Sequence, residues 1–105
     1  MLRKNEKITL IATEYILDED GFRIEKETKT DVFANVDSIT GQEFYNTGLL
    51  NIKPSFRAIV WAAEYNREPI IERKGKRFGV YRTFRRGEDV ELYCQEEIGL
   101  NDELF

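Results

Sequence analysis

Aromatic rings and cations alternate between Arg77 and Arg86, and this is the stretch of the sequence best suited to chemistry. Three rings, those of Phe78, Tyr81 and Phe84, interleave there with the arginines Arg77, Arg82, Arg85 and Arg86. Proteins that bind single-stranded nucleic acids use this combination, because rings stack on bases while guanidinium groups contact phosphates. However, the two phenylalanines share one face of an alternating strand with Val80, which favours a core role for them and leaves Tyr81 as the ring displayed with the arginines. A small nucleic-acid-binding barrel is therefore one hypothesis, and the other is that Tyr81 and the arginines contact a subunit or partner.

The residue types that most enzymes use are scarce in this sequence. It has no histidine and a single cysteine, Cys94, which excludes zinc sites of the usual His/Cys kind, histidine-activated nucleophiles and an intramolecular disulfide. Cys94 falls on the apolar face of a strand, where a small core residue is expected. Carboxylates are abundant but no pair stands apart, and "GKRFG" lacks the ending of a phosphate-binding loop. We therefore predict that the chain is not an enzyme and uses no cofactor or metal ion.

The length and net charge of the chain limit the kinds of protein that it can be. A chain of 105 residues with 41% hydrophobic residues supplies one core, so a single domain should span residues 1–105. The net charge of −4 argues against general attraction to a polyanion and leaves incidental contact with DNA. A basic stretch (67–86) and an acidic one (from Glu88 onward) predict two opposed surfaces through which copies or neighbours can dock. The start is charged and no long apolar run follows, which predicts a cytosolic chain without a membrane span.

Alternating apolar residues and turn signals predict a mainly β fold. Strands are expected over 7–17, 22–36 and 56–65, on both sides of the "KGK" turn at 74–76, and over 89–98. The strand over 56–65 has apolar side chains on both faces, which is typical of a covered strand. Five or six strands with at most one short helix indicate a small antiparallel β-barrel or sandwich. The acidic tail, 99–105, is expected to be flexible.

A long connection, residues 39–55, interrupts this strand pattern. Thr40 and Glu43 have the spacing of a capping box, and Gly48 would end a helix after about two turns. A helix so short is marginal in water, and connections beyond about 12–15 residues are usually functional or disordered. We therefore expect something outside the monomer to order this segment.

A series of short motifs carries a resemblance over nearly the whole chain. An "ITL" strand, the "DEDGF" turn and "VFANV" are followed by "SITGQEFY", "FRAIVW", "GKRFGV" and "VELYCQE". In this order they resemble the head-closure, or head-tail adaptor ("stopper"), proteins in the neck of long-tailed bacteriophages. The most specific match is a small-Gly-x-Glu-aromatic signature formed by Ser38, Gly41, Glu43, Phe44 and Tyr45. The third strand departs from the family, which often has a basic residue before an aromatic one where this chain has "VWAAEY".

The resemblance implies a structural role in the virion of a phage or prophage. Such proteins form a homo-oligomeric ring, twelvefold in the virion, from subunits that are monomers before assembly in the bacterial cytoplasm. The ring lies below the portal and its adaptor, retains the packaged DNA, and offers a docking surface to the tail-completion protein below. A place on the tail-completion side of the same joint is the alternative.

The resemblance also implies that the connection 39–55 projects into the channel and closes it. Its assembly and gating residues would be Ser38, Gly41, Glu43, Phe44, Tyr45, Gly48, Leu49 and Leu50.

Overall fold

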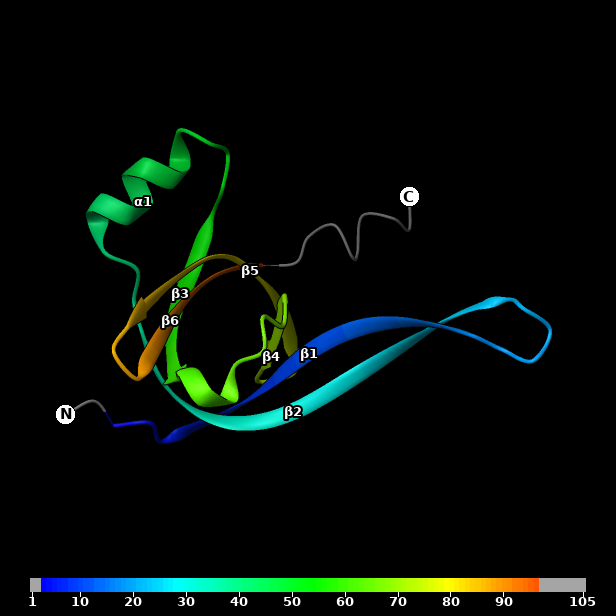
Figure 1. Ribbon diagram of the computed structural model, residues 1–105. Helices are drawn as coiled ribbons and strands as arrows, with labels where there is room; N and C mark the ends of the chain where they lie inside the picture. The colour runs from blue at the N-terminus through cyan, green and yellow to red at the C-terminus, as the bar shows by residue number, and fades with distance from the viewer. Residues whose placement is uncertain (1–2, 97–105) are drawn as a thin grey trace.

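Six antiparallel strands close into a barrel in the computed structural model, which describes residues 3–96 (Figure 1). In chain order the elements are β1 (Glu6–Leu17), β2 (Arg23–Asp37), helix α1 (Gly41–Gly48), β3 (Pro54–Trp61), the 3-10 turn η1 (Ala62–Glu64), β4 (Ile70–Arg73), β5 (Lys76–Arg86) and β6 (Asp89–Glu96). The strand order is β1-β2-β3-β6-β5-β4, and β4 pairs back onto β1. The small barrel expected from the sequence is thus confirmed. The tail predicted to be flexible, 99–105, lies outside the described residues.

The hydrophobic core fills the inside of the barrel, because every second side chain of a strand points inward. It consists of Ile8, Leu10, Val32, Ala34, Phe56, Ala58, Val60, Ile71, Phe78, Val90, Leu92 and Cys94. The rings of Phe56 and Phe78 meet edge to face with their centroids 4.7 Å apart. Cys94 is fully buried, as predicted, and burial raises the pKa of its thiol to about 12. The thiol is therefore protonated at neutral pH and inert as a nucleophile.

Two hairpin turns follow directly from their sequences. At the predicted "KGK" turn, Lys74 and Gly75 both have positive φ, 51° and 79°, as a two-residue turn between twisted strands requires. At the "DEDG" turn, the Asp18 carboxylate accepts hydrogen bonds from the amides of Asp20 (2.9 Å) and Phe22 (2.7 Å). These local hydrogen bonds fix the end of the β1–β2 hairpin.

Strand β3 is shorter than predicted. It ends at Trp61 rather than at residue 65, since the Ala62 amide donates to the Glu88 carbonyl at 2.7 Å and the chain turns into η1. Ala58 and Val60 are buried on one face of β3, and Ile59 is buried on the other face. Trp61, on the same face as Ile59, is 44% exposed. The strand is therefore covered on both faces only over its middle.

A β-bulge in β5 corrects the prediction that Phe84 belongs to the core. The pairing of β5 with β6 shifts between Val80 and Arg82, so that the inward and outward positions exchange beyond that point. Phe78 is buried before the bulge, and Phe84 is 46% exposed after it. Two rings of this strand, not one, therefore reach the outside of the barrel.

The β1–β2 hairpin extends well beyond the barrel (Figure 1). Its strands pair along their full length, from Glu6↔Ala34 to Leu17↔Arg23. In contrast, β4 pairs with β1 only at residues 9–11, and β3 pairs with β2 only at residues 35–37. Residues 12–17 and 23–29 therefore form a two-stranded ribbon, here called the β1–β2 arm. Residues 23–31 are exposed throughout.

Charges of opposite sign lie side by side on neighbouring strands. The basic strand β5 pairs with the acidic strand β6, and Arg86 and Glu91 form an ion pair across them (3.0 Å). The prediction of two opposed charged surfaces is therefore wrong for the described residues. Between Arg3 and Glu96, no helix is long and apolar enough to cross a membrane.

Candidate assembly surface

Helix α1 occupies the middle of the connection 39–55. As the capping box predicts, the Thr40 hydroxyl accepts a hydrogen bond from the Glu43 amide at 3.2 Å, and the helix ends at Gly48. Thr47 is buried, and its hydroxyl donates to the Glu43 carbonyl at 2.9 Å. Pro54 already belongs to β3, which shortens the predicted loop at its far end.

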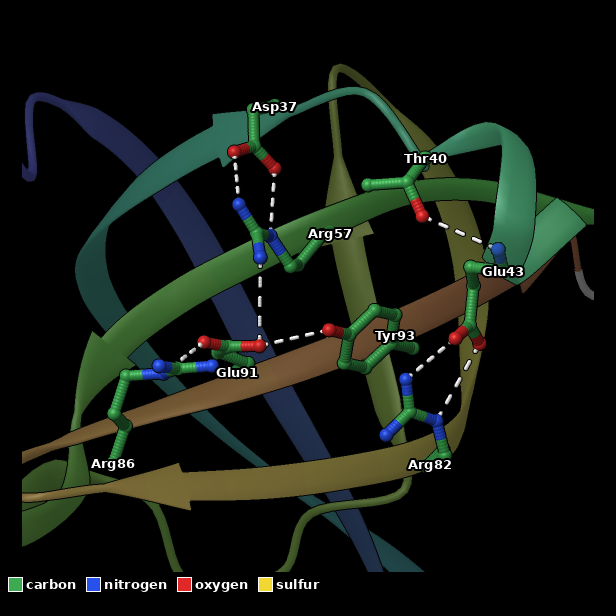
Figure 2. A network of polar contacts seen from close by, with 8 residues as sticks. All are labelled: Asp37, Thr40, Glu43, Arg57, Arg82, Arg86, Glu91 and Tyr93. Carbon is green, nitrogen blue, oxygen red and sulfur yellow. Dashed lines mark hydrogen bonds and ion pairs between the residues drawn. The ribbon is translucent and has the colours of Figure 1, made fainter.

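A carboxylate on α1 fastens the helix to the barrel. Glu43 pairs with Arg82 of β5 (Oε1 to Nη2, 2.6 Å) and accepts a hydrogen bond from the Tyr81 hydroxyl at 2.9 Å (Figure 2 shows the Arg82 pair). The Glu43 side chain is only 14% exposed. Desolvation, followed by this hydrogen bond, raises the pKa of Tyr81 above its ordinary range, and the bond to Glu43 raises the pKa of Arg82. Contacts within one chain thus hold α1, which corrects the expectation that order must come from outside.

A second carboxylate, Glu91, lies at the centre of a network on the outer face of the barrel (Figure 2). It is 4% exposed and accepts hydrogen bonds from Tyr93 (2.8 Å), Arg86 (3.0 Å) and Arg57 (3.4 Å). Desolvation opposes its ionisation. The hydrogen bonds from Tyr93 and Arg86, with the charge of Arg57, nevertheless hold the pKa of Glu91 below its ordinary value. Glu91 is therefore ionised at neutral pH.

The network continues to the end of β2 and to the anchor of α1. Arg57 donates two hydrogen bonds to Asp37, at 2.9 and 2.5 Å, and this contact raises the pKa of Arg57. Tyr93 joins the two clusters, because its hydroxyl donates to Glu91 while its ring lies 3.9 Å from the Arg82 guanidinium. Strands β2, β3, β5 and β6 are thus tied together directly below the base of α1.

Most arginines of β5 are paired with carboxylates of the same chain, which limits their contacts with other molecules. Arg82 and Arg86 are held by Glu43 and Glu91, and Arg77 donates to Glu27 of β2 at 2.6 and 2.9 Å. Over the described part of the chain, no carboxylate lies within 4.0 Å of Arg85, whose Nε donates to the Gly87 carbonyl. Three of the four predicted contact arginines therefore brace the chain itself.

Four of the predicted gating residues are exposed large apolar side chains on or just after α1, here called the α1 patch. Phe44, Tyr45, Leu49 and Leu50 are 58–72% exposed, although each carries a large apolar side chain. Ser38 is exposed just before the helix, and Gly41 and Gly48 are its first and last residues. Exposed clusters of this kind mark surfaces that meet other macromolecules.

Sequence reasoning did not find the Glu91 network. Asp37, Arg57 and Glu91 are 20 and 34 residues apart and meet only through strand pairing. The usable signal was the outward position of Glu91 on β6 next to a strand rich in arginine.

No group of three or more His, Cys, Asp and Glu side chains within residues 3–96 is arranged to hold a metal ion. A search against models of protein families and a search of the curated proteins both found no match to this chain. The features that bear on function are therefore those of the chain itself, the α1 patch and the polar network below it.

Proposed function

We propose that this chain is a structural protein of the phage neck. It forms a ring below the portal and its adaptor, closes the DNA-filled head, and offers the docking surface for the tail. The observation that carries the proposal is the α1 patch, Phe44, Tyr45, Leu49 and Leu50. It lies in the β2–β3 connection, where the resemblance to head-closure proteins implies the channel-closing loop.

A ring would give these exposed side chains a partner. In cyclic symmetry every copy presents the same connection at the same distance from the axis, so neighbouring patches can cover one another. Each large apolar side chain that becomes fully buried contributes about 1.5–3 kcal/mol. Contacts between copies therefore supply the resistance to DNA pressure that the isolated helix lacks.

The charge of the connection also suits a plug that must let DNA pass later. Residues 39–55 carry two charged side chains, Glu43 and Lys53, and Glu43 is neutralised by Arg82. An apolar, nearly uncharged closure makes few phosphate contacts and does not retain the DNA once it opens. Three of the four arginines of β5, Arg77, Arg82 and Arg86, are paired with the carboxylates of Glu27, Glu43 and Glu91.

The anchor of α1 allows such an opening. The Glu43 carboxylate makes the polar contacts between the helix and β5, so α1 can move while the strands below it stay paired. The role uses no cofactor and places the chain at the head-tail interface of the virion, after assembly in the bacterial cytoplasm.

The test replaces the α1 patch in an infectious phage that carries this chain. Phe44, Tyr45, Leu49 and Leu50 are changed to Ser together, and the control is Phe33→Ser, since Phe33 is equally exposed (56%) on a barrel strand. We expect heads with the patch variant to contain the protein but to lose DNA before tails attach, as measured by nuclease sensitivity of the packaged genome.

The other outcomes separate the alternatives. Heads that keep their DNA but fail to join tails would place the chain on the tail-completion side of the joint. If DNA retention and tail joining both equal those of the Phe33→Ser control, α1 is neither plug nor docking surface.

A further inference from the structure

The end of the β1–β2 arm carries a second apolar cluster, far from α1 (Figure 1). Tyr15, Leu17 and Phe22 are 59–72% exposed, and Ile16 and Ile24, which face each other across the two strands, are 44% and 42% exposed. Five large apolar residues exposed at the end of the arm indicate a surface that another molecule covers.

This arm tip has a defined shape before any contact. The Asp18 carboxylate holds the turn, the Arg23 guanidinium lies 4.5 Å from the Tyr15 ring, and the Arg77–Glu27 ion pair fixes the base of the arm to β5. A preformed element loses little conformational freedom on docking. The free edge of β2 alternates charges over residues 25–31, which opposes addition of a further strand. The arm is therefore suited to docking by its tip and not by its edge.

The tip is also strongly acidic. Residues 14–25 hold five carboxylates against one arginine, a net charge of −4 within a single hairpin end. The carboxylates are Glu14, Asp18, Glu19, Asp20 and Glu25. A surface that receives the tip must therefore combine apolar walls with cations.

Such a surface lies between the η1–β4 connection and β5. Two adjoining hollows of about 470 and 210 Å³ share Tyr65, Arg67 and Thr83. Arg85, without a carboxylate partner among the described residues, lines the smaller one, and no carboxylate lines either. We call this pair the basic hollow.

The backbone at the basic hollow is held in a conformation that displays a cation. Arg67 has φ of 63°, which long side chains rarely adopt, and its side chain is exposed. The turn is braced because the Tyr65 hydroxyl donates to the Glu68 carbonyl (2.8 Å) and the Asn66 amide donates to the Glu68 carboxylate (2.6 Å). Strain of this kind persists where the surrounding contacts maintain it, commonly at sites of interaction.

We propose that the arm tip of one copy inserts into the basic hollow of the next copy. Leu17 and Phe22 meet the apolar lining residues Ala62, Val80 and Val90, and the turn carboxylates face Arg67 and Arg85. The arm points away from its own barrel, so the contact joins two molecules (Figure 1). Tip and hollow are different surfaces, which makes the contact heterologous and able to close into a ring. It supplies the subunit interface of the proposed function and in that sense rests on it.

Engineered cysteines test this contact on the isolated full chain, because the native Cys94 is buried and does not react. Leu17→Cys marks the tip, Thr83→Cys marks the hollow, and Ser55→Cys on β3 is an exposed control outside it. We expect a mixture of the Leu17→Cys and Thr83→Cys chains to form a disulfide-linked dimer under mild oxidation. The mixture with Ser55→Cys should yield at least about tenfold less.

Charge-reversal variants test whether the contact between tip and hollow depends on their opposite charges. Adding Arg67→Glu and Arg85→Glu to the Thr83→Cys chain should reduce the yield about tenfold, and adding Glu19→Lys and Asp20→Lys to the Leu17→Cys chain should restore it. Thermal melts followed by circular dichroism verify that the reversal variants are folded. If one is not, the comparison of Thr83→Cys with Ser55→Cys still decides.

Three outcomes overturn the proposal: equal yields with Ser55→Cys, preferential pairing of Leu17→Cys with itself, or no dimer at millimolar protein. Failure of this contact can also be distinguished from failure of the channel-closing role. If the cross-link does not form but heads with the α1 patch variant leak DNA, the contact is refuted and α1 remains the plug. If the cross-link forms specifically but heads with the α1 patch variant retain DNA, the contact stands and α1 is not the plug.

Discussion

Replacing Glu91 by Gln should destabilise the barrel by about 2 kcal/mol. The side chain keeps its shape but loses its charge, and it turns an amide NH₂ toward Arg57 and Arg86. Removing one partner of a fully buried pair typically costs about 3–5 kcal/mol. Here the cost is lower for two reasons. The Arg86 side chain is 71% exposed and returns to water, and Arg57 keeps its two hydrogen bonds to Asp37.

Equilibrium unfolding in urea measures this loss. With an m-value of about 1–2 kcal/mol per M for a domain of this size, the midpoint should fall by roughly 1–2 M at neutral pH. The matched control is Glu88→Gln, since Glu88 is exposed and lies three residues earlier in the chain. Exposed substitutions usually change stability by less than about 0.5 kcal/mol.

A double-mutant cycle then assigns the loss to the network. Arg57→Lys combined with Glu91→Gln should cost less than the sum of the two single changes, because both act on one set of hydrogen bonds. If Glu91→Gln unfolds at the same urea concentration as Glu88→Gln, Glu91 and its hydrogen bonds do not hold the strands together.

Two further predictions concern pH and the anchor of α1. The pKa values of Glu6 and Glu91 lie below their ordinary value of 4.5 in the folded chain. At a pH between the folded and the ordinary pKa of either group, the unfolded chain therefore binds more protons than the folded chain. The free energy of unfolding should therefore fall as the pH drops below about 4.5, and urea midpoints across a pH series should fall less steeply for Glu91→Gln than for wild type. Glu43→Gln should weaken the anchor of α1 on β5 and speed hydrogen exchange of the α1 amides about tenfold relative to a Gln42→Ala control, while the β3 amides keep their protection. Unchanged α1 exchange in Glu43→Gln would show that Glu43 is not what fastens the helix.

Features set by neighbouring residues in the sequence were predictable. The turn at Lys74 and Gly75, the cap at Thr40 and the end of α1 at Gly48 each depend on a few adjacent residues. Strand alternation likewise predicted the inward position of Cys94. In each case the controlling interaction spans only a few residues, so the sequence contains the whole cause.

Features that depend on pairing between distant strands were not predictable. The bulge between Val80 and Arg82 leaves no local signal, yet it exchanges the inward and outward positions and exposes Phe84. The contacts of Asp37 with Arg57 require the register of β2 on β3. The wrong prediction of two opposed charged surfaces could have been avoided from the sequence, because the short turn at Gly87 already indicated that β5 and β6 are neighbours.

The bulge also explains how the arginines of the one strand β5 contact several different parts of the chain. Before it, Arg77 reaches Glu27 and fixes the base of the β1–β2 arm; after it, Arg82 holds α1 through Glu43 and Arg86 covers Glu91. Arg85 lies on the opposite side of the same strand and lines the basic hollow. The base of the β1–β2 arm and helix α1 are thus both fastened to β5. If neighbouring copies meet through the arm as proposed, a force on the arm reaches the strand that holds α1. The proposed ring would then have a direct physical route from the subunit contact to the closure of its channel.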